Sequence, residues 1–292
     1  FYKKTYMKNL KYLIQYISII FLFFIFKLLG FKYSLTISSK IISLLGPLFR
    51  SNKLIKSNFD IAFPKLDNST KNKFIKEMWE NYGKILAEYM FIKDFRFSKL
   101  SQNIEVEGQE VLEDIKKNNQ PVIFISGHFN NFELMAMQID KSGIDLATIY
   151  RPLNNRYLNK IMERIRKKYI CNKQIKKGIS GTKLLLNHFK KGSSIALMID
   201  QRVSEGIKCD FFNKRAFTTT IPAQFIKKFK CKVVPVYIER KNNFYFKLTI
   251  QNPIQFSDKF TNDAITLELN NILEKMIIKN PSQWIWTHNR WK

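Results

Sequence analysis

The first hydrophobic pattern along the chain is an apolar run near its N-terminus. From Leu13 to Phe26 only Gln15 and Ser18 interrupt the run, and Lys27 follows it directly. A membrane span needs about 20 apolar residues, a length that is reached if Lys27 extends its amine toward the lipid headgroups. We therefore expect residues 1–30 to form a membrane segment. We favour a tilted single span, with a deep interfacial anchor or a buried core helix as the alternatives.

A second apolar stretch, from Ser38 to Phe49, is too short to span a bilayer. Its Gly46-Pro47 pair predicts the end of a helix, so we expect an interfacial helical segment within residues 31–56. Lysines and arginines flank the apolar run on both sides, and the positive-inside rule therefore does not assign its orientation.

Beyond these segments the pattern becomes that of a globular α/β domain, residues 57–292. A cluster of helix-capping residues at 67–70 precedes apolar positions at helical spacing, which predicts one long amphipathic helix to about Ile92. Short β-rich runs then alternate with helical patterns, and two further strands surround Lys241-Asn242-Asn243. This alternation predicts a mixed, largely parallel sheet flanked by helices. The β-rich runs are residues 121–126, 145–150, 194–199 and 232–238.

Composition adds an expectation about partners. The chain has 292 residues, of which 45% are hydrophobic, and its net charge is +27. Such a charge indicates an anionic partner, which can be nucleic acid, acidic lipid or an acidic protein. The three cysteines and three histidines are scattered, without the paired spacing of disulfide frameworks or clustered-histidine metal sites. We expect neither a metal nor a cofactor.

Candidate chemistry follows the predicted strand 121–126, which ends just before Gly127-His128. Ligand sites in open α/β sheets gather where strands end and helices begin. Glu133 lies five positions further on, where it is expected to accept the Nδ1 proton of His128 and leave Nε2 free as a base. The alternative is a surface histidine near a helix start that Asn131 and Glu133 merely cap. No serine or cysteine nucleophile stands beside His128, so we expect a substrate hydroxyl to attack directly.

Other charged residues have a binding and a structural interpretation. Arg151 precedes a proline, and its guanidinium offers two donors to a phosphate or carboxylate, or else forms a surface ion pair. Arg164 and Arg166 belong to a basic helix face that suits an anionic lipid or an acidic protein, or is simply solvated. Asp200 follows a buried strand, and we interpret it as an anchor for an active-site arginine or loop.

At this point the sequence resembles a known family. Residues 126–133, Ser-Gly-His-Phe-Asn-Asn-Phe-Glu, are similar to the catalytic block of the bacterial lipid A late acyltransferases, the Kdo-dependent lauroyl and myristoyl transferases. Further blocks that resemble those of the family occur in order along the chain. They are residues 58–64, residues 150–155, Asp200-Gln201, residues 211–219 and residues 283–292.

The resemblance implies a glycerolphosphate-acyltransferase-like fold, with residues 57–292 as the acyltransferase domain. It implies an enzyme of the bacterial inner membrane, with its catalytic domain on the cytoplasmic face, that moves an acyl chain from acyl carrier protein to a hydroxyl of an acyl chain on a Kdo-lipid A precursor. His128 would be the general base and Glu133 its partner. The implied substrate-binding residues are Arg151, Arg164, Arg166, Asp200, Gln201 and Asn131.

Two departures from the family pattern affect the choice of acyl chain more than the reaction. They are Asn213, where glycine is usual, and Phe132, where many members have tryptophan. Two alternative functions differ from lipid A acylation. An acyltransferase acting on another membrane phospholipid or glycolipid would share His128 and Glu133. A membrane-tethered nucleic-acid-binding protein would explain the charge but not the ordered blocks, and we expect no nucleic-acid partner.

Overall fold

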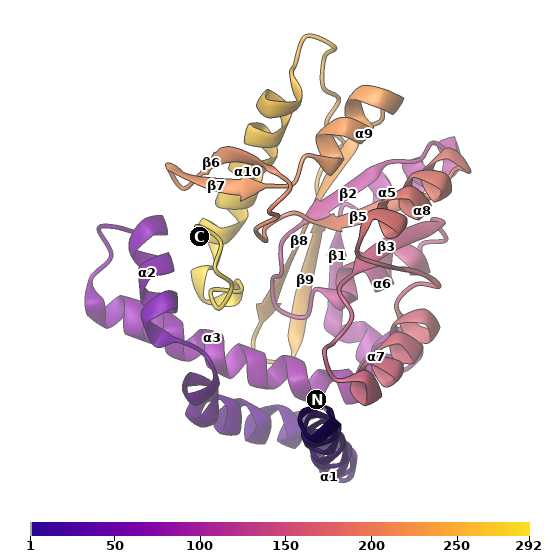
Figure 1. Cartoon of the computed structure of the whole chain (residues 1–292). Coiled ribbons are helices and arrows are strands. Elements are labelled where there is room, and N and C mark those ends of the chain that lie inside the picture. Colours follow the sequence, from indigo (N-terminus) through magenta and orange to yellow (C-terminus); the bar gives the residue numbers. More distant parts are fainter. Residues whose placement is uncertain (1) are drawn as a thin grey trace.

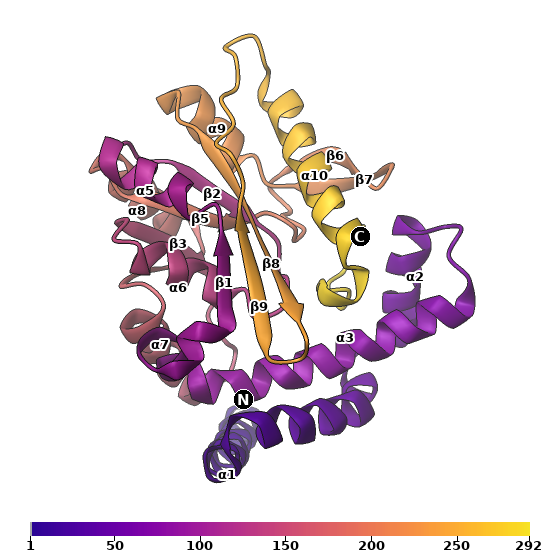
Figure 2. The same ribbon diagram turned by 180° about the vertical axis from the view of Figure 1, so that it is seen from behind.

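The architecture is a mixed α/β sheet flanked by helices, with a long apolar helix at the N-terminus (Figures 1 and 2). The structure is a computed structural model, which describes the backbone of residues 2–292 and the side chains from Met7 onward. Within this part of the chain, seven strands form the main sheet and two form a separate hairpin. In spatial order the main sheet consists of β1 (Ile104–Glu107), β9 (Tyr245–Ile250), β8 (Val233–Lys241), β2 (Ile123–Ser126), β5 (Ser194–Met198), β3 (Leu146–Tyr150) and β4 (Lys173–Lys176).

The sheet is largely parallel, as the sequence predicts. Strands β8, β2, β5, β3 and β4 run parallel to one another. Strand β9 runs antiparallel to β8, and β1 pairs with β9 in parallel. The four predicted β-rich runs correspond to β2, β3, β5 and β8, and the expected antiparallel pair is β8–β9. Asn242 and Asn243 make its turn with φ of 41° and 62°, left-handed conformations that asparagine tolerates.

Four strands were not predicted. Strands β1 and β4 are the two edges of the sheet, and each buries one of its four residues, so their sequences lack a clear apolar pattern. The hairpin of β6 (Ile207–Phe211) and β7 (Lys214–Thr218) lies apart from the main sheet and packs on α10 (Asn262–Lys279).

Helices occupy most of the remaining chain. The predicted long helix is α3 (Asn68–Glu88), capped by the Asp67 side chain, which accepts the backbone N–H of Thr70. It ends four residues earlier than expected, since the chain tightens into a 3₁₀ turn at Tyr89–Phe91. The other helices are α2 (Asn52–Ala62), α4 (Ile92–Phe97), α5 (Gln109–Asn118), α6 (Glu133–Lys141), α7 (Arg156–Tyr169), α8 (Ile179–Lys190) and α9 (Ile221–Phe229).

The N-terminal helix α1 (Tyr2–Phe49) bends at Gly30, whose φ of 74° lies outside the helical region. We call residues 2–29 the first arm and residues 31–49 the second arm. The hydroxyl of Ser34 lies 2.6 Å from the carbonyl oxygens of both Phe26 and Gly30, which satisfies acceptors that the bend frees. From Met7 to Phe49 the helix is long and apolar enough to cross a membrane, with a mean hydropathy of 2.2 in its most apolar window.

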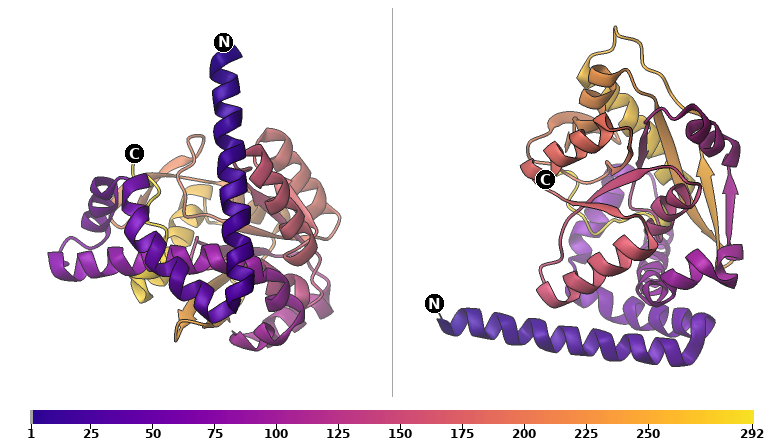
Figure 3. Two further views of the ribbon diagram at one scale, coloured as in Figure 1. Left: turned by 90° about the horizontal axis from the view of Figure 1, so that it is seen from below. Right: turned by 90° about the vertical axis from the view of Figure 1, so that its right-hand side faces the viewer.

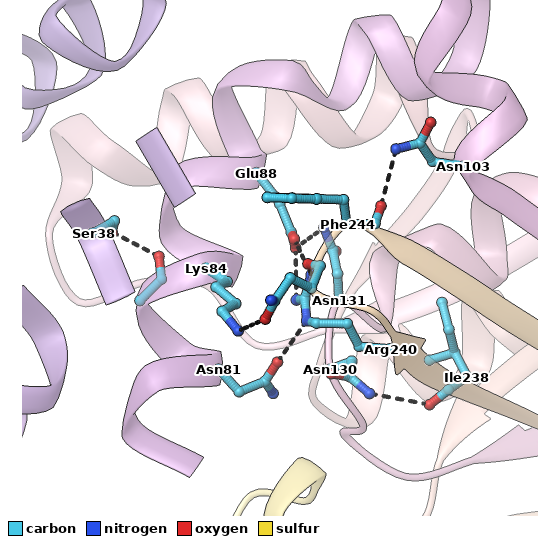
Figure 4. Close-up of polar contacts among 12 residues, drawn as sticks. Ser38, Asn81, Lys84, Glu88, Asn103, Asn130, Asn131, Ile238, Arg240 and Phe244 are labelled. Carbon is cyan, nitrogen blue, oxygen red and sulfur yellow. Dashed lines mark hydrogen bonds and ion pairs between the residues drawn. The ribbon is translucent and has the colours of Figure 1, made fainter. Parts of the chain in front are cut away.

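The predicted helix end at Gly46-Pro47 is wrong, because α1 continues through Pro47 to Phe49. Close packing explains why glycine stands at this point. The ring of Trp79 on α3 lies where a side chain at position 46 would be, and the backbone of Ser38 similarly excludes a side chain at Gly83. Ser38 donates a hydrogen bond to the carbonyl of Gly83 at 2.6 Å (Figure 4). The second arm is therefore fixed to α3.

Candidate active site

Two neighbouring parallel strands bring the central residues of the site together. Ser126 at the end of β2 pairs with Met198 at the end of β5, and the backbone N–H of residue 199 donates to the Ser126 carbonyl at 3.0 Å. His128 and Asp200 each lie two residues beyond these paired ends. Both residues therefore lie beyond the carboxyl ends of neighbouring strands, at the same edge of the sheet. There, His128 Nδ1 is 2.8 Å from Asp200 Oδ1.

Asp200 holds both the ring and the backbone of His128. Its second oxygen, Oδ2, accepts the backbone N–H of His128 at 2.7 Å and the indole N–H of Trp284 at 2.8 Å. The carboxylate is fully buried, and burial opposes its charge, but His128 and these hydrogen bonds outweigh that effect and lower the pKa of Asp200 to about 2. The interpretation of Asp200 as an anchor holds for the loop and not for an arginine.

His128 presents its other ring nitrogen as a free acceptor. Its side chain is 19% exposed, and no hydrogen bond joins Nε2 to any residue from Met7 to the C-terminus. Burial alone would lower the pKa of His128, but the charge and hydrogen bond of Asp200, with a further contribution from Glu133, raise it above its usual value. Because Nδ1 faces a carboxylate, the neutral ring carries its proton there and leaves Nε2 as the base.

The predicted contact between Glu133 and the Nδ1 proton of His128 is wrong. Glu133 opens α6, and its Oε1 accepts from Arg166 Nε at 2.7 Å and from the hydroxyl of Tyr89. The strand register explains this difference, since it places Asp200 on Nδ1 and leaves Glu133 to face α7. Glu133, Arg166 and Tyr89 form a second, adjacent polar cluster, in which Arg166 also lies 5.5 Å from the ring of Tyr150.

The remaining predicted binding residues differ in position. Of the two candidate arginines on α7, Arg166 joins this cluster, whereas Arg164 is exposed on another face of the helix. Arg151 is exposed just after β3, and Gln201 is half-buried next to Asp200. Neither Arg151 nor Gln201 makes a side-chain hydrogen bond within the described part of the chain.

Asn131 lies inside the protein instead of facing a substrate. It is fully buried, and its amide donates to Glu88 Oε2 at 3.1 Å (Figure 4). Glu88, at the end of α3, also pairs with the guanidinium of Arg240 on β8, whose Nε donates to Asn81 at 3.1 Å. The sequence pattern gave no indication of the Glu88–Arg240 pair, which fixes the His128 loop to α3 and β8 through Asn131.

The C-terminal segment closes the other side of the loop. The backbone N–H of Asn130 donates to the carbonyl of Gln283 at 3.0 Å, and Phe129 forms a β-bridge with Trp284. Asn130 has a left-handed φ of 43°, which turns the chain between these contacts. Trp284 is buried in the core.

His288 also forms a hydrogen bond beside the site. Its Nε2 accepts the backbone N–H of Arg202 at 2.9 Å, and burial lowers the pKa of the ring. Asn58, from the upstream block at residues 58–64, donates to the carbonyls of Trp286 and His288 at 2.8 and 2.9 Å. Two blocks about 230 residues apart in sequence are therefore one structural unit beside the site.

From Met7 to the C-terminus, no serine or cysteine side chain forms a hydrogen bond with His128. The nearby Ser126 hydroxyl faces Met135 Sδ at 3.3 Å. The three cysteines are buried, and desolvation raises the pKa of Cys171 to about 11 and of Cys231 to about 12. Among the described side chains, the His128–Asp200 pair therefore has no serine or cysteine partner.

The protein therefore has a helix-flanked α/β sheet with a histidine–carboxylate pair at the carboxyl ends of two neighbouring parallel strands. Residues 2–292 match the family described as bacterial lipid A biosynthesis acyltransferase, and the chain belongs to this family of acyltransferases. It is 25% identical over 252 residues to the lipid A biosynthesis palmitoleoyltransferase of Escherichia coli (strain K12), covering 84% of this chain and 80% of that protein. The lauroyltransferase and the myristoyltransferase of the same organism are 24% and 22% identical, covering 83% of this chain and 79% and 75% of their own lengths.

Proposed function

We propose that this protein moves a fatty acyl chain from acyl carrier protein to a hydroxyl of an acyl chain on a Kdo-lipid A precursor, with His128 as the general base. The observation that carries the proposal is the free Nε2 of His128, whose Nδ1 is held by the buried Asp200. Membership of the lipid A acyltransferase family supports the lipid acceptor. Following the resemblance, we place the enzyme on the inner membrane with its catalytic domain on the cytoplasmic face.

The chemistry needs one proton relay. As the acceptor oxygen attacks the thioester carbonyl, Nε2 of His128 takes its proton, and Asp200 stabilises the imidazolium that forms. The tetrahedral intermediate then expels the phosphopantetheine thiolate of the carrier, which takes the proton back from the imidazolium. One ester forms, one thioester breaks, and His128 returns to its neutral form.

The developing oxyanion needs a positive group or hydrogen-bond donors. The backbone N–H groups of His128, Phe129 and Asn130 already donate within the protein. The charge of Arg166 acts on His128, where it opposes protonation of the ring. We therefore assign oxyanion stabilisation to the Arg166 guanidinium, held in place by Glu133.

Exposed basic residues near the site suit both substrates. Arg151 is exposed just after β3, and Arg164 is exposed on α7, the helix that also carries Arg166. Guanidinium groups bind phosphates and carboxylates in a bidentate manner, and the lipid precursor and the carrier both present such groups. We assign Arg151 and Arg164 to the initial capture of these anionic partners.

The experiment uses membranes that contain the full chain, a Kdo-modified tetra-acylated lipid A precursor and a set of acyl carrier protein thioesters. We expect one added acyl group in the product mass spectrum, and its loss in His128→Ala. The matched control is His188→Ala, which changes a histidine of α8 outside the site and should leave transfer intact.

The absence of transfer by folded wild-type protein with every donor would overturn the lipid A acceptor. Transfer to a phospholipid or glycolipid in the same membranes, again lost in His128→Ala, would then identify the alternative acceptor. Full activity in His128→Ala would overturn the assigned base.

A further inference from the structure

Both arms of α1 lie on one face of the molecule. They form the lower edge in Figure 1, and the view from below in Figure 3 shows them as the two limbs of an L in front of the rest of the chain. Most of the exposed large apolar side chains in the described part of the protein belong to these arms. On the first arm they are Met7, Leu10, Leu13, Ile14, Ile17, Phe21, Phe24, Leu28 and Leu29; on the second they are Tyr33, Ile37, Ile41, Leu44, Leu45, Leu48 and Phe49.

The first arm contacts the globular part near Gly30 and again near its own middle, at Tyr12 and Tyr16. Near Gly30, Phe23 and Phe26 are buried in a cluster with Ala87 of α3. Toward the N-terminus, the amide of Asn155, which caps α7, donates to the carbonyl of Tyr12 at 2.8 Å. One turn further along the arm, the ring of Tyr16 lies 5.8 Å from the ring of Tyr157.

These contacts leave no room for the arm to cross a bilayer while the globular part stays in water. At 1.5 Å per residue, Tyr12 lies about 21 Å along the helix from Phe26, which is most of the thickness of a hydrocarbon core. A spanning arm would carry the start of α7, with exposed Arg156 and Lys160, into that core. Charged side chains in hydrocarbon are strongly unfavourable, so a span would require these contacts to break.

The charge of the same region fits the surface of an anionic leaflet. Residues 7–59 contain eight basic residues and no acidic residue. Lys11, Lys32 and Lys40 are exposed on the arms, and Arg50 follows the second arm directly. Basic side chains that border an apolar helix face are typical of helices that lie in the interface plane of acidic membranes.

We propose that the first arm does not span the membrane and that both arms of α1 lie in the plane of a single leaflet rich in anionic lipid. This in-plane orientation of α1 replaces the tilted span that the sequence favours. It also places the site near that leaflet, because Tyr89, which packs against the cluster around Phe26, donates its hydroxyl to Glu133. An acceptor lipid in the same leaflet then reaches the enzyme without leaving the membrane surface.

A cross-linking experiment tests the contact on which the proposal rests. In native membranes, the pair Tyr16→Cys and Tyr157→Cys is treated with a short bismaleimide, and linked peptides are measured by mass spectrometry. The control pair is Ile17→Cys with Tyr157→Cys, since Ile17 is 57% exposed and faces away from α7. The native cysteines are buried, which keeps their background low. We expect at least tenfold more product from the first pair, and equal yields from the two pairs would overturn the contact.

A topology experiment tests whether α1 lies in the plane of one leaflet or spans the membrane. Two single variants are used: Lys11→Cys lies in the first arm, and Lys53→Cys lies at the start of α2, just after the second arm. Each is labelled with a membrane-impermeant maleimide in sealed inverted vesicles and in intact spheroplasts. We expect both positions to label from the same side. Labelling from opposite sides would establish a span and overturn the proposal. Neither the cross-linking nor the labelling experiment requires catalysis, so both outcomes are independent of the proposed acyl transfer.

Discussion

Asp200 contacts His128 twice, once at the ring and once at the backbone, and this double contact decides which group orients the base. A carboxylate on Nδ1 selects the tautomer with a free Nε2 and stabilises the charged ring during proton transfer. Glu133 has neither contact, and its oxygens face Arg166 and Tyr89. The site therefore contains two separate ion pairs, His128 with Asp200 and Arg166 with Glu133.

The pH dependence of acyl transfer should follow the raised pKa of His128. The base must be neutral to accept a proton, so activity should rise with pH and reach half its maximum above pH 6.5, the ordinary value for histidine. Asp200→Asn removes the charge that raises this pKa. The acid limb should then move to lower pH, and kcat should fall about 10⁴-fold, as when the aspartate of a catalytic triad is replaced by asparagine. Initial rates between pH 5 and 9 give both quantities.

Glu133→Gln is the matched comparison for this prediction. Because Glu133 acts on the ring only through space, its removal should move the acid limb less than Asp200→Asn does. A larger shift in Glu133→Gln than in Asp200→Asn would show that Glu133 orients the base and that the observed pairing is not the active one.

Among the helices, α3 connects α1 to the site. Its outer side packs against the second arm of α1 at Gly83, and its last residue, Glu88, holds the loop through Asn131. The charge of Glu88 is balanced by Arg240 on β8, and both side chains are almost fully buried. Figure 4 shows this pair at the junction of helix, loop and strand.

Arg240→Gln should destabilise the protein, because it leaves the Glu88 carboxylate buried without its partner. Loss of one member of a buried ion pair costs about 3–5 kcal/mol of unfolding free energy. Thermal unfolding in detergent should show a clear fall in Tm, and the double variant Glu88→Gln with Arg240→Gln should recover part of it. Arg215→Gln, on the exposed hairpin, is the control with little change. A double variant less stable than Arg240→Gln alone would contradict this account.

Hydrophobic periodicity predicted the elements that are buried on a regular pattern, and little else. It identified β2, β3, β5 and β8, while the half-exposed edge strands β1 and β4 gave too weak a signal. Local spacing also suggested the wrong partner for His128. Glu133 is close to it in sequence, but Asp200 is close to it in the sheet, and the order β2–β5 is set by long-range packing that no local pattern contains.

In the whole molecule, segments distant in sequence surround the site. Helices α1 and α3 lie on one side, and a C-terminal segment that we call the cover lies on the other. The cover is residues 283–292, which bond to the loop through Gln283 and to the β6–β7 hairpin through Arg290. Arg290 donates to the carbonyl of Phe217 at 2.6 Å, and Asn58 from α2 holds the same segment from the other side. The matching blocks at residues 58–64, 126–133, 211–219 and 283–292 are therefore neighbours in space.

Trp286 tests this closure, because it is fully buried and stacks on Phe59 of α2 with ring centroids 4.0 Å apart. Trp286→Ala removes a large aromatic side chain from the core, and such changes cost about 3–5 kcal/mol of unfolding free energy. Trp286→Phe keeps an aromatic ring against Phe59 and should cost markedly less. Thermal unfolding of the purified full chain measures both variants, and acyl transfer measured beside it should fall with Tm in Trp286→Ala, because Trp284 shares this segment and holds Asp200. An unchanged Tm in Trp286→Ala would mean that residues 283–292 do not close the fold, and that the hydrogen bond from Trp284 is maintained by other contacts.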